Sequence, residues 1–233
     1  MELLNFDQNA KTVKGQKKGV LTGILYLAPA SVSGINVCPN ASEGCKSACL
    51  NTAGMGIFKP VQDARIRKTK ALFADKAAFV AQLKKEIGFA MKRAAKKGME
   101  LAIRLNGTSD LPWENIFPMQ EFPTLAFYDY TKSPLRMDKY LKGLMPKNYT
   151  LTFSLSETNM PIALTVLKQG GNVAMVFGTK DVKAFPKKHL GFRVINGDEN
   201  DLRFKDPKNV IVALKMKGKA IYDESGFVQK CAA

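Results

Sequence analysis

The stretch from Gly19 to Ala28, GVLTGILYLA, decides the fold class of this 233-residue chain. It is apolar and rich in residues that favour strands, and Pro29 ends it. Because ten residues are too few for a convincing helix, the stretch predicts a buried strand. A loop that contains three of the four cysteines follows this strand directly.

Six further apolar runs follow, and stretches with helical features separate several of them. The runs cover residues 101–105, 124–127, 149–153, 172–177, 192–195 and 210–214. Helices are expected from Pro60 to about Phe73, from an N-cap at Asp75 to a stop at Gly98, and over 111–120, 134–144 and 160–169. This alternation predicts an α/β fold with crossover helices. We expect about seven mainly parallel strands in a partial or irregular (β/α) TIM-like barrel, with a doubly wound open sheet as the alternative.

No internal repeat, low-complexity segment or long linker divides the chain, so residues 1–233 are predicted to form a single α/β domain. Residues 1–18 are predicted to be a basic N-terminal arm, either loose or folded as a short edge hairpin around Gly15. Residues 215–233 are predicted to be a small C-terminal hairpin around Gly218, followed by a tail.

The chain is strongly basic, with a formal net charge of +16. Residues 59–97 contain twelve Lys or Arg against three acids, which favours nucleic acid or an acidic protein as a partner. Lysines that only solvate helix faces are the alternative. No apolar run approaches the ~20 residues that cross a bilayer, and the N-terminus lacks the features of a secretory signal. We therefore expect no membrane association and a cytosolic location, where thiols stay reduced.

Cys38, Cys45 and Cys49 lie within twelve residues, and the fourth cysteine is Cys231. In a reducing compartment, clustered cysteines are better candidates for metal ligands than for disulfides. Structural zinc sites usually contain two tight cysteine or histidine pairs, whereas this chain has no second pair and a single histidine, His189. The loop therefore favours an iron–sulfur cluster, of the 4Fe–4S or the 3Fe–4S type, with zinc as the alternative. Cys231 is the expected fourth ligand.

Polar side chains at the ends of the predicted strands are candidates for a catalytic pocket, since the carboxyl ends of parallel strands build sites. They offer acids, an amide and a guanidinium that can bind a carboxylate or a phosphate. The alternative is that they are ordinary turn and cap residues. The candidates are Arg104, Asn106, Asp110, Asp129, Glu157 and Asp198.

Two resemblances extend these predictions. Three cysteines after the first strand of a partial barrel resemble the radical S-adenosylmethionine enzymes, although the gaps are longer here and Asn106 to Asp110 replaces the Gly-Gly-Glu motif. A closer resemblance is to a bacteriophage and prophage family labelled gene product 88-like, which implies a viral origin and the host cytoplasm. Its matching pieces are the cysteine loop and residues 104–114, 128–132, 154–159 and 197–207.

Together these observations predict an iron–sulfur protein with a redox or enzymatic role. A nucleic-acid-binding phage protein, in which a cluster or zinc only stabilises the fold, is one alternative. A divergent radical S-adenosylmethionine enzyme is the other.

Overall fold

A sheet of ten strands organises the protein, and the structure, a computed structural model, describes residues 1–7 and 10–231. Nine strands lie side by side in the order β1-β2-β3-β4-β5-β6-β9-β8-β7, and β10 pairs with β6. The strands are β1 (Leu4–Asn5), β2 (Val20–Leu25), β3 (Glu100–Arg104), β4 (Ala126–Thr131), β5 (Tyr149–Ser154), β6 (Val173–Phe177), β7 (Lys188–His189), β8 (Phe192–Asn196), β9 (Val210–Lys215) and β10 (Val228–Gln229).

The predicted α/β class and the mainly parallel strands are confirmed. All pairs from β2 to β8 are parallel, whereas β1 joins β2 and β7 joins β8 in antiparallel fashion. The sheet does not close, because β1 and β7 lie at its two ends. The TIM-like barrel is therefore not confirmed. The order β6-β9-β8 also departs from the neighbour-to-neighbour succession of such a barrel, and apolar runs alone carry no information on strand order.

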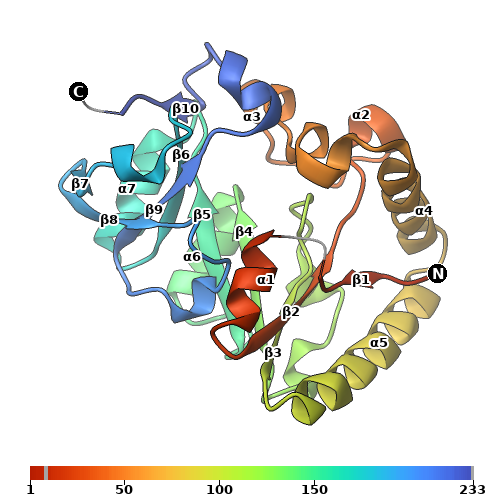
Figure 1. The fold of residues 1–233 in the computed structure, drawn as a ribbon. Helices are drawn as coiled ribbons and strands as arrows, with labels where there is room; N and C mark the ends of the chain where they lie inside the picture. The colour runs from red at the N-terminus through yellow and green to blue at the C-terminus, as the bar shows by residue number, and fades with distance from the viewer. Residues whose placement is uncertain (8–9, 232–233) are drawn as a thin grey trace.

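Helices cover one face of the sheet, and the main core lies beneath them (Figure 1). Alternate strand side chains such as Leu21 and Ile103 belong to this core, together with Leu83 of α5 and Leu167 of α7. The intervening positions point to the other face, where Val20, Ala102 and Tyr128 pack with Leu202 in a smaller cluster. The helices of this layer are α4 (Lys59–Ala74), α5 (Lys76–Lys96), α6 (Pro134–Leu141) and α7 (Met160–Lys168).

Several predicted helix ends are confirmed. Asp75 caps α5 by accepting a hydrogen bond from the Ala78 N–H at 2.9 Å, and Gly98 follows α5 with a φ of 62°. Pro60 lies in the first turn of α4, where its missing N–H costs nothing.

Three predicted segments differ in the structure. Residues 111–120 form two short 3-10 helices instead of one α-helix, because Pro112 and Pro118 each lack the N–H that a continuous helix needs. The expected N-terminal arm contains β1 and the helix α1 (Ala10–Gln16), whose Thr12 is buried, while residues 8 and 9 lie outside the described residues. The expected hairpin around Gly218 is a 3-10 helix, and residues 232 and 233 of the tail lie outside the described residues.

The remaining elements are short and lie mostly in the loops that follow the strands. They are α2 (Ala30–Ser33), α3 (Glu43–Ser47), η1 (Leu50–Thr52), η2 (Gly54–Ile57), η3 (Trp113–Asn115), η4 (Met119–Glu121), η5 (Val182–Ala184), η6 (Arg203–Lys205) and η7 (Gly218–Tyr222). Within the described residues, every helix is too short or too polar to span a bilayer.

Truncation of a side chain on the buried face of α5 measures how much the main core contributes to the stability of the protein. Ile87 is completely buried, so Ile87→Ala should lower the free energy of unfolding by ~2–5 kcal/mol, the usual cost of a core cavity. Phe89 on the same helix is 59% exposed, and Phe89→Ala should change stability by less than ~0.5 kcal/mol. Urea unfolding of both variants measures the difference, and equal effects would contradict the assignment of the buried face.

Candidate functional site

A cavity of about 1060 Å³ opens where the central strands end, and the cysteine loop forms part of its wall. This volume lies at the upper end of the range of small-molecule sites, ~300–1,000 Å³. Cys38, Cys45 and Cys49 all line it. The opposite wall comes from residues that follow or end strands β2, β3, β4, β5 and β9, and from the inner side of α4.

A carboxylate from the β5–α7 loop holds the cysteine loop in place. Glu157 accepts hydrogen bonds from the Ser42 hydroxyl at 2.7 Å and from the Gly44 N–H at 2.8 Å. Ser42 in turn caps α3 by accepting from the Cys45 N–H at 3.3 Å. Burial alone would raise the pKa of Glu157, but these hydrogen bonds lower it, so the carboxylate is ionised at neutral pH. Glu157, predicted as a pocket residue, therefore positions the cysteines from outside the cavity.

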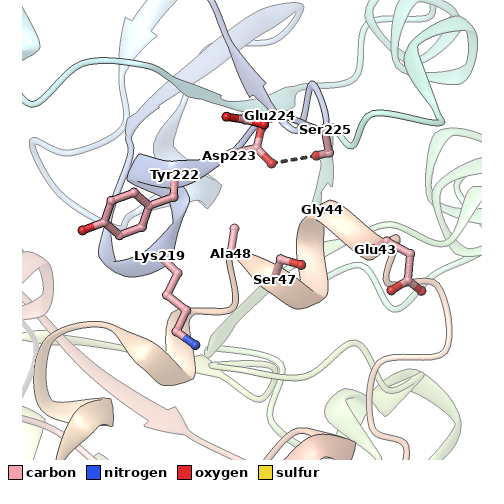
Figure 2. A pocket seen from close by; sticks show the side chains of 9 residues that line it. All are labelled: Glu43, Gly44, Ser47, Ala48, Lys219, Tyr222, Asp223, Glu224 and Ser225. Atoms are coloured by element: carbon pink, nitrogen blue, oxygen red, sulfur yellow. Dashed lines mark hydrogen bonds between the residues drawn. The ribbon is translucent and has the colours of Figure 1, made fainter.

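The other side of α3 packs against the C-terminal segment. Figure 2 shows Gly44 and Ala48 facing Asp223 and Ser225 across a second, smaller cavity of about 360 Å³. A Cβ atom built on Gly44 would overlap the Ser225 hydroxyl and would lie 2.8 Å from the Phe227 Cβ. Glycine is therefore required here, because any side chain would push α3 away from its support.

The three loop cysteines are free thiols in close electrostatic contact with one another. Burial raises the pKa of Cys38 to about 12, and the charges of Asp110, Cys49 and Cys45 add to this effect. Burial also raises the pKa of Cys49, whose sulfur accepts a hydrogen bond from the Asn51 N–H at 3.5 Å. Without a metal the Cys38 and Cys49 thiols are therefore protonated at neutral pH, and metal binding by them would release protons.

Two cations of α4 point into the cavity and were not among the predicted site residues. Arg65 is 7% exposed, donates to the Asn51 Oδ1 at 2.8 Å, and lies over the Tyr26 ring at 4.9 Å. Lys68 is 5% exposed and donates to the Leu3 carbonyl oxygen. Burial lowers the pKa of both, that of Lys68 to about 8. Their spacing of three residues on one helix was the available signal, but residues 59–97 were interpreted as an outward-facing basic surface.

A single metal ion and an iron–sulfur cluster need different arrangements of their ligands. In residues 1–7 and 10–231, no three Cys, His, Asp or Glu side chains are placed to share one metal ion. A zinc ion needs such convergence, because its four ligands surround a single centre. An iron–sulfur cluster is larger than a single ion, and each thiolate binds a different iron, so its ligands need not converge on one point.

The structure does not bring Cys231 to the other three cysteines. It follows β10 and packs at the edge of the main core, and it does not line the cavity. Cys38 and Cys49 interact electrostatically with each other and with Cys45, while Cys231 does not contribute to either. As described, the loop offers three ligands.

Arg104, at the end of β3, lines the cavity and is bound to a buried carboxylate. Its guanidinium lies 2.9 Å from the Asp201 Oδ2 and 4.6 Å from the centre of the Tyr130 ring. Asp201 also accepts a hydrogen bond from the Tyr128 hydroxyl at 3.1 Å. Burial alone would raise the pKa of Asp201, but Arg104 and Lys11 lower it. This ionised pair adds donor groups to the cavity without adding net charge.

Asn106 and Asp129 are buried and joined to each other by hydrogen bonds. Asp129 accepts from the Asn106 N–H at 2.7 Å and from the Tyr149 hydroxyl at 2.8 Å. Asn106 accepts from the Leu111 N–H and so closes the loop after β3. Burial raises the pKa of Asp129 to about 6. Asp129 lies within β4 rather than after it, and it does not line the cavity, so its contacts support a positioning role.

Asp110 and Asp198 are both held in ion pairs. Asp110 lines the cavity beside Cys38, and it lies 2.6 Å from Arg136, which also pairs with Glu114. Asp198 lies outside the cavity lining, where it pairs with Lys11 and Lys217 at 3.0 Å each. Of the six predicted pocket residues, the cavity therefore brings together Arg104, Asn106 and Asp110.

Comparisons with known proteins agree with the closer of the two resemblances. A family model described as Gene product 88 matches residues 2–231, which confirms the resemblance to the gene product 88-like phage family. No curated protein and no solved structure matches the chain. The similarity to radical S-adenosylmethionine enzymes is not confirmed.

A pair of glycine substitutions tests the support of α3. Gly44→Ala should destabilise the protein by ~1–3 kcal/mol, because the new methyl group overlaps Ser225 and Phe227. Gly88→Ala, within α5 and with no atom near the added methyl, should instead stabilise it by ~0.5–1 kcal/mol. Thermal unfolding measures both, and a Gly44→Ala protein as stable as the parent would contradict the packing of α3.

The ion pairs of Asp198 predict a dependence of stability on pH. Burial alone would raise the pKa of Asp198, but Lys11, the Lys215 N–H and Lys217 lower it from its ordinary value of 3.8 to about 2. The pairing therefore stabilises the protein above pH ~4 by about 2 kcal/mol and is lost as the pH falls toward 2. Asp198→Asn should be less stable by about that amount at pH 7, with a shrinking difference in acid.

The matched control is Asp138→Asn, which breaks an exposed pair with Lys142. Such surface pairs contribute ~0–1 kcal/mol, so this variant should stay close to the parent at every pH. Chemical unfolding between pH 2.5 and 7 compares the two variants. A constant difference between Asp198→Asn and the parent across this range would show that the carboxylate charge is not the cause.

Proposed function

The chain belongs to the Gene product 88 family, and we propose that Cys38, Cys45 and Cys49 hold an iron–sulfur cluster used in a redox or enzymatic reaction. The observation that carries this proposal is the placement of three thiols on one wall of the 1060 Å³ cavity. Thiolates are the ligands that iron–sulfur clusters use. The space beside them is large enough for a small molecule, which supports chemistry on a bound substrate over a purely structural cluster.

The surroundings of the cysteines suit a negatively charged cluster. The positive charges of Arg65 and Lys132 both lower the pKa of the Cys49 thiol, although burial dominates and raises it. These cations would offset part of the charge of the thiolates. The Asn51 N–H, which donates to the Cys49 sulfur, is the kind of hydrogen bond that tunes the reduction potential of a cluster.

Three ligands change the expected role of Cys231. The sequence favours this residue as a fourth ligand, whereas its absence from the residues that line the cavity supports a cluster held by the loop alone. A four-iron cluster with three protein thiolates has one iron that can bind a small molecule. A three-iron cluster would instead serve in electron transfer. In either case Arg104, Asn106 and Asp110 line the space where that molecule would lie.

Nucleic-acid binding is the second candidate, because α5 carries exposed lysines along its length. They are Lys76, Lys85, Lys92, Lys96 and Lys97. The structure reduces the charge available to this surface, however, since Arg65 and Lys68 of the same basic segment point into the cavity. The arrangement of the cysteines also gives zinc less support than a cluster.

Two matched cysteine substitutions test the proposal. After anaerobic purification, the parent protein should contain iron and acid-labile sulfide, and Cys45→Ser should retain less than about a tenth of both, because one of three ligands is lost. Cys231→Ser replaces the same side chain elsewhere and should retain the full content of iron and sulfide. Iron and sulfide analysis with an optical spectrum provides the measurement.

Three results would contradict the proposal in different ways. Zinc in place of iron in the parent protein would reject the cluster. Full iron content in Cys45→Ser would reject the loop as its binding site. An equal loss of iron and sulfide in Cys231→Ser would show that Cys231 is a ligand, and would reject an iron that lacks a protein ligand.

A further inference from the structure

We propose that the cavity binds a small organic anion, and that Arg65 and its neighbouring cations bind the phosphate or carboxylate group of this molecule. The cavity is lined by seven basic side chains and two acidic ones. The basic residues are Lys11, Arg65, Lys68, Arg104, Lys132, Lys215 and Lys217, and the acidic residues are Asp110 and Asp201. This inference goes beyond the proposed cluster. Arg65 and Lys132 also act on Cys49, so a cluster would share their positive charge with the anion, and the other lining cations carry the inference without it.

Part of this positive charge is balanced inside the protein, since Asp198 pairs with Lys11 and Lys217. Asp201 pairs with Arg104, and Asp110 pairs with Arg136, which lies outside the cavity lining. In the described part of the chain, no carboxylate lies within 4.0 Å of the basic groups of four lining residues. These four are Arg65, Lys68, Lys132 and Lys215. An ionised group that lacks a counter-charge in a partly buried site attracts an anion.

Arg65 gives the most direct sign of a ligand. Its side chain is more than nine-tenths buried, yet its Nε has no hydrogen-bond partner, and its nearest acceptor is the neutral Asn51 amide. This Nε is closed off from the cavity, so an oxyanion would be bound by the terminal nitrogens of the guanidinium group, whose planar fork fits it. Lys68, one turn along α4, adds a second buried positive charge, which is held by the Leu3 carbonyl oxygen and the Asn5 side chain and lies in the field of Glu86 and Glu2.

Tyr26 connects this pair to the strand ends. Arg65 lies over its ring, and the same tyrosine interacts electrostatically with Arg104 at the end of β3. The Arg104 Nε is also buried without a hydrogen-bond partner. Both guanidinium groups therefore lie near one aromatic side chain and line the cavity in the region between α4 and β3.

The size and lining of the cavity define the class of ligand. A volume of about 1060 Å³ exceeds the need of inorganic phosphate and suits an organic molecule that carries the oxyanion. Arg65 and Arg104 each lie over one face of the Tyr26 and Tyr130 rings, which reduces the ring surface left for stacking with the bases of a single strand. A small phosphorylated or carboxylated molecule fits these features better than a nucleic acid.

Binding of defined anions by the full-length protein tests the inference. Pyrophosphate and citrate serve as the phosphate and carboxylate probes, in calorimetry at about 0.15 M salt, where weak surface attraction is screened. At least one of them should bind the parent protein and raise its Tm with increasing concentration. Arg65→Gln should weaken that binding about tenfold or more, and Arg65→Lys should recover part of it.

Further variants separate the site from general charge and from folding. Lys215→Gln removes a cavity charge from a half-buried position and should weaken binding without loss of the folded state. Lys92→Gln removes an exposed charge from α5, which does not line the cavity, and should leave affinity unchanged. The iron content of the parent protein is measured beside its affinity for the anion, so a failure of the cluster proposal would be visible in the iron content alone.

Three outcomes of the binding measurements would reject the proposed anion site. The inference is rejected if neither probe binds the parent protein, or if Lys92→Gln weakens binding as much as Lys215→Gln does. It is also rejected if folded Arg65→Gln and Lys215→Gln proteins both bind as the parent does. Preference for pyrophosphate or for citrate identifies the ligand as a phosphate or as a carboxylate.

Discussion

The contact between Glu157 and the start of α3 is the interaction on which the site depends. One carboxylate accepts from the Ser42 hydroxyl and from the Gly44 N–H, and this fixes the short helix that carries Cys45. Helix α3 has only five residues and could not hold its conformation alone. The cysteines therefore face the cavity because a residue at the end of β5 and the packing of Gly44 hold them there.

Much of the fold was accessible from the sequence, since apolar runs and caps report local structure. The strand runs, the Asp75 cap and the helix before Gly98 depend on residues close together in the chain, and the structure contains them. Strand order and closure depend on which distant edges pair, and no local pattern records that β9 lies between β6 and β8. Pro112 and Pro118 argue from the sequence against a continuous helix over 111–120, because proline lacks the N–H that the helix needs.

The candidate site was predictable in outline for the same reason. Cysteine clustering identified one wall, and strand-end residues identified part of the other, including Arg104, Asn106 and Asp110. Arg65 and Lys68 were overlooked because a run of basic residues does not reveal which of them turn inward. Asp129 was misplaced because β4 continues past the apolar run, so a residue expected after the strand lies within it. Only the three-dimensional arrangement shows that unpaired cations and thiols share one cavity.

The packing of Gly44 against Phe227 also constrains how the protein is made. These residues are 183 positions apart, and β10, which follows Phe227, joins the sheet only beside β6. A ribosome releases the cysteine loop long before the segment that supports it, and contacts between such distant residues form late. The nascent loop therefore emerges with its thiols exposed to solvent. Any metal loaded during synthesis would meet a flexible cysteine peptide, whereas the enclosed site exists only after the C-terminal segment has docked.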